Sequence, residues 1–141
     1  MSLTEAREFF ERYRAAFNRL DGDAVADLWH ERSGIADHKQ GVGALTWWPD
    51  DAPMRSNHRA LCDLYRTLGY HSADFEILDH LAMGHCHAFV RLHWTLRRAD
   101  GSVLQSFHTG YQLMRTAHGP RVLMATAYEE DLAEMKRHAA H

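Results

Sequence analysis

The sequence is short of the features that define several protein classes. It has only two cysteines, Cys62 and Cys86, too few for a disulfide framework, so we expect a protein of the reducing cytoplasm. No apolar run approaches the length that a bilayer span needs, and no charged start with an apolar middle suggests a signal peptide. The 16 lysines and arginines are scattered and the net charge is −3, so neither nucleic acid nor a membrane is an expected partner.

The length and composition are those of a single globular unit. A chain of 141 residues, 45% hydrophobic and 25% charged, can bury one real core. No internal repeat, low-complexity tract or linker divides it. We therefore expect one domain over residues 1–141.

Apolar residues recurring every three or four positions predict three helices in the first half of the chain. The first is long, and Ser2 with Glu5, or Thr4 alone, can cap its start. A shorter second helix begins at Asp21 or Asp23 and is expected to stop at Gly34. The third begins near Pro53 and ends at Gly69. Its apolar stripe includes one imidazole: Met54, His58, Leu61, Cys62, Tyr65 and Leu68.

The residues after Gly34 alternate like a short strand, and this alternation bears on the direction of one carboxylate, that of Asp37. In Ile35-Ala36-Asp37-His38, side chains two apart lie on the same face. If Ile35 points into the core, Asp37 points the same way. A carboxylate directed inward is a candidate functional group, whereas one beyond the strand end faces solvent or accepts backbone N–H bonds in the next turn.

From His71 onward the period changes to two, which predicts an antiparallel meander. The expected strands cover 73–82, 85–98, 102–115 and 120–128, joined by short turns, with a small hairpin at 41–48 before the third helix. A short helix is expected over 129–137. Helices first and strands second indicate an α+β fold.

With these elements placed, the chain resembles the nuclear transport factor 2-like superfamily, and within it the SnoaL-like and ketosteroid isomerase-like proteins. The segments that carry the resemblance are "RYRAAFNRLDGDAVADLW", "GIAD", "DLYRTLGYH", "HAFVRLHWTLRRADGSVLQSFHTGYQLMR" and "GPRVLMATAYEED". The resemblance implies a cone-shaped roll, in which a curved antiparallel sheet wraps around three N-terminal helices and leaves an internal apolar pocket. Because this superfamily includes isomerases, dehydratases and plain binding modules, fold alone does not specify function.

The resemblance also implies a catalytic group. In ketosteroid isomerase-like members, a tyrosine on the first helix and an aspartate at the end of the first strand serve as oxyanion donor and general base. Tyr13 and Asp37 stand at the matching positions. The second carboxylic acid of that site is missing, because its position falls at Thr109. A carboxylate in an apolar pocket, helped by Tyr13 and by His58 as a second acid or base, still supports acid–base chemistry.

Aromatic and apolar side chains are expected to line the pocket around these three residues. Where two tryptophans are adjacent, as at 47–48, only one can point inward. Core packing remains the alternative for Tyr13, His58 and the tryptophans. The expected ligand-binding residues are Phe17, Trp47, Tyr65, Trp94, Phe107, Thr109, Tyr111, Met124 and Tyr128.

The histidines do not predict a metal site. His85 and His87 share a strand face with His93, but Cys86 points the other way and no third ligand converges on them. We therefore expect neither a metal nor another cofactor.

The sheet face that carries these histidines mixes polar and apolar residues, and no helix remains to cover it. That composition, with the resemblance, predicts a homodimer through strands 85–98 and 102–115. Three function classes stay open: an isomerase, lyase or hydrolase with Asp37 as base, a non-catalytic binder of a small apolar molecule, and an association domain. The apolar lining favours a small-molecule pocket.

Overall fold

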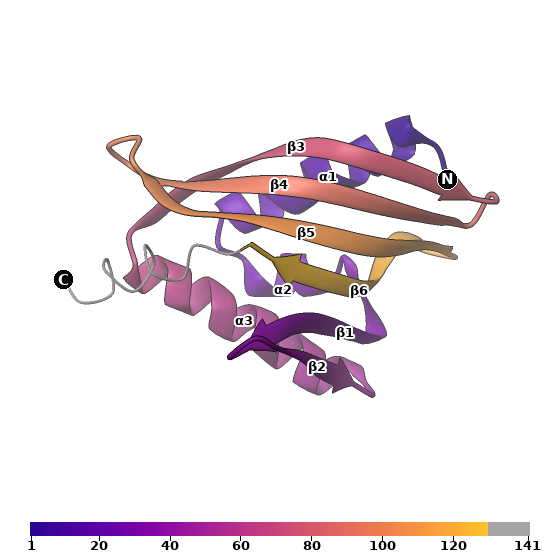
Figure 1. The fold of residues 1–141 in the computed structure, drawn as a ribbon. Coiled ribbons are helices and arrows are strands. Elements are labelled where there is room, and N and C mark those ends of the chain that lie inside the picture. The colour runs from indigo at the N-terminus through magenta and orange to yellow at the C-terminus, as the bar shows by residue number, and fades with distance from the viewer. Residues whose placement is uncertain (130–141) are drawn as a thin grey trace.

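The computed structural model describes residues 1–129 and shows three helices packed on one face of a six-stranded sheet (Figure 1). The helices are α1 (Leu3–Asn18), α2 (Gly22–Ala26) and α3 (Asp51–Thr67). The strands are β1 (Trp29–Lys39), β2 (Val42–Trp48), β3 (Tyr70–Met83), β4 (His87–Arg98), β5 (Val103–Thr116) and β6 (Gly119–Tyr128). The expected α+β fold class is confirmed. The helix expected over 129–137 lies outside the described residues, apart from Glu129.

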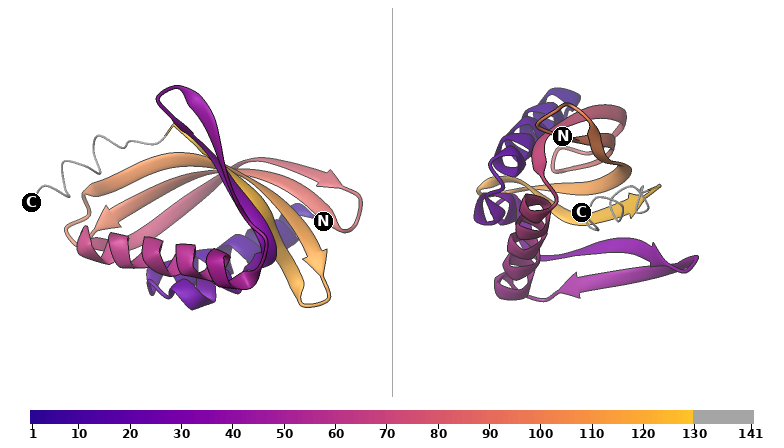
Figure 2. Two further views of the ribbon diagram at one scale, coloured as in Figure 1. Left: turned by 90° about the horizontal axis from the view of Figure 1, so that it is seen from below. Right: turned by 90° about the vertical axis from the view of Figure 1, so that its left-hand side faces the viewer.

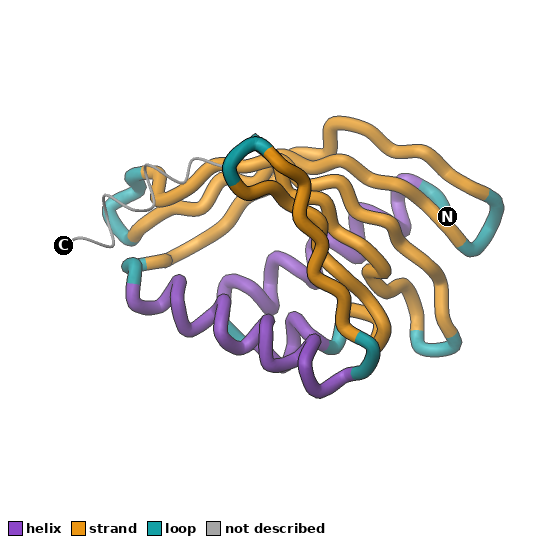
Figure 3. Tube along the Cα trace, turned by 60° about the horizontal axis from the view of Figure 1, so that its bottom comes forward, coloured by secondary structure: helices purple, strands orange, loops and turns teal. Residues whose placement is uncertain are grey.

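The sheet is mixed, with the strand order β2-β1-β6-β5-β4-β3. All neighbouring strands are antiparallel except β1 and β6, which run parallel. The last strand therefore joins the N-terminal hairpin to the meander in one surface. This surface arches over the helices, which lie on its concave side (Figures 2 and 3).

The helix ends follow from local chemistry. The Ser2 hydroxyl accepts the Glu5 N–H at 3.1 Å and the Glu5 carboxylate accepts from Ser2, which completes a capping box at α1. The Asp21 carboxylate caps α2 by accepting the Ala24 N–H at 3.0 Å. Gly69, with a φ of +81°, follows α3 in the left-handed conformation that favours glycine.

The second helix is shorter than the sequence pattern suggested. It ends at Ala26, and β1 begins at Trp29, so Gly34 lies inside a strand and does not terminate a helix. A Cβ at Gly34 would lie 2.7 Å from the Thr46 backbone oxygen and 2.9 Å from the Trp47 ring. This glycine therefore permits close packing of the hairpin, and the prediction of a helix stop was wrong.

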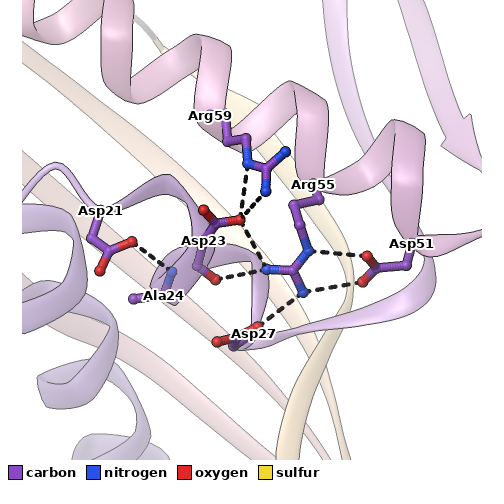
Figure 4. A network of polar contacts seen from close by, with 7 residues as sticks. All are labelled: Asp21, Asp23, Ala24, Asp27, Asp51, Arg55 and Arg59. Carbon is purple, nitrogen blue, oxygen red and sulfur yellow. Dashed lines mark hydrogen bonds and ion pairs between the residues drawn. The ribbon is translucent and has the colours of Figure 1, made fainter.

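Ion pairs join α2 to α3. The Arg55 guanidinium donates to the Asp51 carboxylate at 3.0 Å, to Asp27 at 2.9 Å and to Asp23 at 3.3 Å, while Arg59 donates to Asp23 at 2.9 Å (Figure 4). The arginines lower the pKa of Asp23, chiefly through Arg59, and Arg55 lowers the pKa of Asp51. These contacts fix the N-terminal half of α3 against the α2 segment.

The core lies between α1, α3 and the concave face of the sheet. Phe9 and Phe10 of α1 are fully buried, as are Val90 and Leu92 of β4. Within residues 1–129, none of the helices combines the length and the apolar character that a bilayer crossing requires.

Candidate functional site

A cavity of about 430 Å³ lies between α1, α3 and the concave face of the sheet. Its wall is mainly aromatic and aliphatic, with a few polar tips, as is typical of ligand pockets. The residues that line it are Tyr13, Phe17, Trp29, Ile35, Asp37, Asn57, His58, Ala60, Leu61, Leu64, Tyr65, Trp94, Gln105, Phe107, Thr109, Tyr111, Ala125 and Ala127.

The structure brings the three proposed catalytic residues to this one cavity. Tyr13 comes from α1, Asp37 from β1 and His58 from α3. Most of the proposed binding residues also line it. They are Phe17, Tyr65, Trp94, Phe107, Thr109 and Tyr111.

Asp37 lies on the same side of β1 as Ile35, since both line the cavity. Its side chain is exposed, however, and makes no hydrogen bond or ion pair with a described residue. The carboxylate therefore belongs to the mouth of the cavity, and the desolvated position expected for it was wrong. The reason is the length of β1, which continues past the edge of the core in the β1–β2 hairpin.

Tyr13 is held by a tryptophan that the sequence had placed on a helix. The Trp29 indole N–H donates to the Tyr13 hydroxyl oxygen at 3.2 Å, and both side chains are buried. Burial raises the pKa of Tyr13 well above its ordinary value. A second pair repeats this arrangement on the sheet, where the Trp94 indole donates to the Tyr111 hydroxyl at 3.0 Å.

His58 is packed between two indole rings. Its ring centroid lies 4.5 Å from Trp29 and 5.7 Å from Trp48, and only 2% of its surface is exposed. Neither ring nitrogen has a hydrogen-bond partner among the described residues. Burial, helped by the nearby Arg55 charge, lowers the pKa of His58 to about 4. The imidazole is consequently neutral at physiological pH.

Gln105 and Tyr65 form the polar contact at the far side of the cavity. The Tyr65 hydroxyl donates to the Gln105 side-chain oxygen at 2.6 Å, and both residues are buried. A buried glutamine on the inner face of a strand departs from the alternation of apolar inner residues with polar outer residues. That departure was visible in the sequence and could have marked Gln105 as a site residue.

Three of the predicted binding residues lie outside the cavity lining. Trp47, which pairs with Gly34 across the hairpin, is 52% exposed, whereas Trp48 is buried. Met124 and Tyr128 point to the outer face of the sheet. The small side chains of Ala125 and Ala127 take the inner positions, and no sequence signal had singled them out.

Among residues 1–129, no lysine or arginine side chain belongs to the lining. Asp37 is the one carboxylate that the described part of the chain contributes to the lining, and it lies at the mouth of the cavity. Of the described residues, no group of three or more His, Cys, Asp or Glu side chains is arranged to hold a metal ion. His87 lies in β4 on the outer face, paired with Met83.

Comparison of the sequence with known protein families identifies the family of this chain. A family model described as NTF2-like protein (DUF6841) matches residues 4–130. The chain belongs to this NTF2-like family. The ketosteroid isomerase-like resemblance of the sequence and the observed fold agree with this assignment. Among curated proteins, none matches the chain.

Solved structures share the NTF2-like fold at low sequence identity. An NTF-2 like protein of unknown function from Shewanella oneidensis has a TM-score of 0.71 at 15% identity, covering 90% of this chain and 98% of its own. A domain of unknown function with a cystatin-like fold from Nostoc punctiforme has a TM-score of 0.69 at 12% identity, covering 90% of this chain and 78% of its own. A ketosteroid isomerase-like protein from Erwinia carotovora has a TM-score of 0.63 at 18% identity, covering 89% and 93%. At these identities the likeness establishes the fold alone.

Proposed function

We propose that this NTF2-like protein binds a small, uncharged and largely apolar molecule in the cavity between α1, α3 and the sheet. The observation that carries the proposal is the cavity itself, about 430 Å³ in volume and walled by aromatic side chains. Cavities of a few hundred cubic ångströms with such linings are the usual form of small-molecule sites.

The electrostatics of the wall support an uncharged ligand. An anion would find no arginine or lysine among the lining residues that the structure describes, and His58 is neutral at physiological pH. Within residues 1–129, a cation would find only the Asp37 carboxylate, which lies at the solvent-exposed mouth. Since transfer of an unpaired ion into an apolar site is strongly unfavourable, the wall selects against both charges.

Acid–base catalysis in the same cavity is the second candidate function. It is favoured by the presence of Asp37, Tyr13 and His58 in the lining of one cavity. In that case Asp37 is the general base at the mouth, Tyr13 donates a hydrogen bond to the developing oxyanion, and the reaction is of the isomerase, lyase or hydrolase type. His58 is the weakest of the three catalytic candidates, because its ring nitrogens are inaccessible to a ligand.

The binding proposal is tested by filling the cavity from one face of β6. Ala127 lines the cavity, whereas Thr126 is exposed on the opposite face of the same strand. Binding of neutral naphthalene derivatives is measured by quenching of tryptophan fluorescence and by calorimetry. We expect Ala127→Phe to weaken binding about tenfold or more, and Thr126→Phe to leave it within about threefold. Failure of every neutral probe to bind, or binding that survives Ala127→Phe unchanged, would contradict the proposal.

A further inference from the structure

A second cavity, of about 390 Å³, lies where the start of α3, the α2–β1 connection and the β5–β6 hairpin meet. The Val122 N–H donates to the Leu28 carbonyl oxygen at 2.9 Å and so holds the start of β6 against this connection. Figure 4 shows the side of the region formed by α2 and α3, where Asp27 and Asp51 flank Arg55. The volume is within the range of small-molecule sites, about 300–1,000 Å³.

The wall of this second cavity is charged, in contrast to the aromatic wall of the first. Two buried residues, Ala26 and Trp29, supply its apolar part. The charged groups that line it are the carboxylates of Asp27, Glu31 and Asp51 and the guanidinium groups of Arg55 and Arg121. Groups of both signs therefore border one space.

Most of these charges are already paired within the protein. The Arg55 guanidinium donates to Asp51 at 3.0 Å, to Asp27 at 2.9 Å and to Asp23 at 3.3 Å (Figure 4). These contacts use its donors and neutralise the carboxylates on that side of the cavity. A ligand in the second cavity therefore gains little from Arg55, Asp27 or Asp51.

One cation and one anion of the wall remain available. Among residues 1–129, the Arg121 guanidinium makes a single hydrogen bond, to the Pro120 carbonyl oxygen at 2.7 Å, and no ion pair. The ion pair of Glu31 is with Arg32 at 4.0 Å, a distance too long for a hydrogen bond, and both of these side chains are more than 60% exposed. Arg121 and Glu31 can thus each meet a charge on a ligand.

This pair of opposite charges determines the chemical class of ligand. A simple anion at Arg121 would be repelled by the Glu31 carboxylate, and a simple cation at Glu31 would be repelled by Arg121. A molecule that carries both charges satisfies both residues. The guanidinium fork matches a carboxylate group, which it can bind through two parallel hydrogen bonds.

We propose that the second cavity binds a zwitterionic α-amino acid with an apolar side chain. The ligand carboxylate pairs with Arg121, its ammonium group pairs with Glu31, and its side chain packs on Trp29 and Ala26. This site is separate from the proposed function, because its ligand, its charged residues and its place in the fold differ from those of the first cavity.

The indole of Trp29 provides a specific signal for this site. Trp29 lines both cavities, whereas Trp94 lines only the first. Both indoles donate to tyrosine hydroxyls of the first cavity, Trp29 to Tyr13 and Trp94 to Tyr111. A ligand in the second cavity should therefore move the NMR signal of the Trp29 indole N–H and leave that of Trp94 unchanged, whereas a ligand in the first cavity should move both.

The test compares three probes of similar shape that differ in charge. L-Phenylalanine carries both charges, phenethylamine lacks the carboxylate, and 3-phenylpropionate lacks the ammonium group. Each is titrated to about 10 mM into the wild-type protein, Arg121→Gln and Glu31→Gln, and the indole signals are followed by NMR. The matched control is Arg97→Gln, because Arg97 also donates to one backbone carbonyl, that of Gly101 at 3.1 Å, and lies outside both linings.

We expect L-phenylalanine to bind the wild-type protein at least about fivefold more tightly than either singly charged probe. Arg121→Gln and Glu31→Gln should each remove this preference, and Arg97→Gln should keep it. A Trp29 signal that does not move with L-phenylalanine would overturn the proposal. Equal binding of the three probes, or an equal shift of Trp94, would overturn it as well. The comparison of probes on the wild-type protein decides the matter even where a variant fails to fold, and none of these outcomes bears on neutral ligands of the first cavity.

Discussion

The imidazole of His58 stacks obliquely on the indole of Trp29, with ring centroids 4.5 Å apart and no hydrogen-bond partner for either imidazole nitrogen among the described residues. The buried ring therefore resists protonation, and its pKa falls to about 4. An unfolded chain binds this proton near pH 6.5, whereas the folded protein binds it only near pH 4. Acid consequently favours the unfolded state over this interval.

The first prediction is a loss of stability on acidification that depends on His58. Between pH 6.5 and pH 4, the buried ring should lower the free energy of unfolding by up to roughly 3 kcal/mol. Below about pH 4, the contribution of His58 to the free energy of unfolding no longer changes with pH. In His58→Leu this part of the pH dependence should vanish, as measured by urea denaturation at a series of pH values. His71→Leu, at an exposed position, is the control and should keep the wild-type slope. A His58→Leu slope equal to the wild-type slope would show that the ring is protonated in the folded state.

The second prediction concerns Gly34 and Gly43, which lie in the two strands of the β1–β2 hairpin. A Cβ at Gly34 would meet the Thr46 carbonyl oxygen at 2.7 Å, whereas a Cβ at Gly43 would have no atom within 4 Å. Gly34→Ala should therefore destabilise the protein by about 1–3 kcal/mol, and Gly43→Ala should be neutral or slightly stabilising. Thermal denaturation of the two variants checks this. Equal melting temperatures would mean that the hairpin relaxes freely around position 34.

The same glycine shows where sequence reasoning ends. Gly34 follows a helix-like stripe, and a glycine there is a good stop signal, so a longer second helix was a natural prediction. The true reason for the glycine is contact with Thr46 and Trp47 across a hairpin. A tertiary contact of this kind leaves no trace in local periodicity. The fold class, the long first and third helices and the β3–β6 meander were predictable because each rests on a long apolar pattern.

A β-bulge in β6 explains why Met124 and Tyr128 were wrongly predicted to line the cavity. Gln112 pairs with Met124 but Leu113 pairs with Val122, so Leu123 is an extra residue in the ladder. Strict alternation from the buried Val122 puts Met124 and Tyr128 inside. The bulge shifts the phase by one residue, and Ala125 and Ala127 become the inner positions. A bulge depends on the register of the partner strand, which a single strand does not encode.

The third prediction tests Asp37 as a general base. If the carboxylate at the cavity mouth removes a proton next to a carbonyl group, the protein should accelerate deuterium exchange into the methyl group of 2-acetylnaphthalene in D₂O, followed by NMR. Asp37→Asn should abolish the acceleration and change the free energy of unfolding by less than about 0.5 kcal/mol, because the side chain is exposed. Asp50→Asn, also exposed, is the matched control. Acceleration that persists in Asp37→Asn would remove this residue from the chemistry.

The fourth prediction concerns the guanidinium that joins α2 to α3. Arg55 contacts Asp23, Asp27 and Asp51, and α3 carries one wall of the cavity (Figure 4). Arg55→Met should lower the free energy of unfolding by about 1–2 kcal/mol, a modest figure because the carboxylates are largely exposed. Arg55→Lys should not restore the loss, since an ammonium cannot make the forked contacts. Arg32→Met, which removes only a 4.0 Å pair with Glu31, serves as the control. Full rescue by lysine would indicate that charge alone matters here.

The outer face of the sheet supports a proposal of self-association. Register places Leu81 and Phe89 on this face, and both are exposed, at 60% and 37%. Trp47 extends the apolar surface onto β2. The helices cover only the concave side, so residues 1–129 contain no helix that shields this surface (Figure 2). Exposed apolar side chains on an uncovered sheet face are typical of an interaction surface.

We propose a homodimer that pairs the outer faces of β4 and β5, with a total buried area of at least about 1,000 Å². Gln112, on β5, pairs with Phe89 on β4 and Met124 on β6, near the middle of this face. Gln112→Arg would bring a like charge from each copy to the interface, so it should shift the protein toward monomer, with dissociation weakened or abolished in high salt. The control is Ser56→Arg, which adds the same charge on the exposed side of α3, away from the sheet. This variant should remain a dimer. Light scattering coupled to gel filtration at micromolar concentration measures the mass of each. A monomeric wild-type protein, or a dimer that both variants disrupt equally, would exclude this interface.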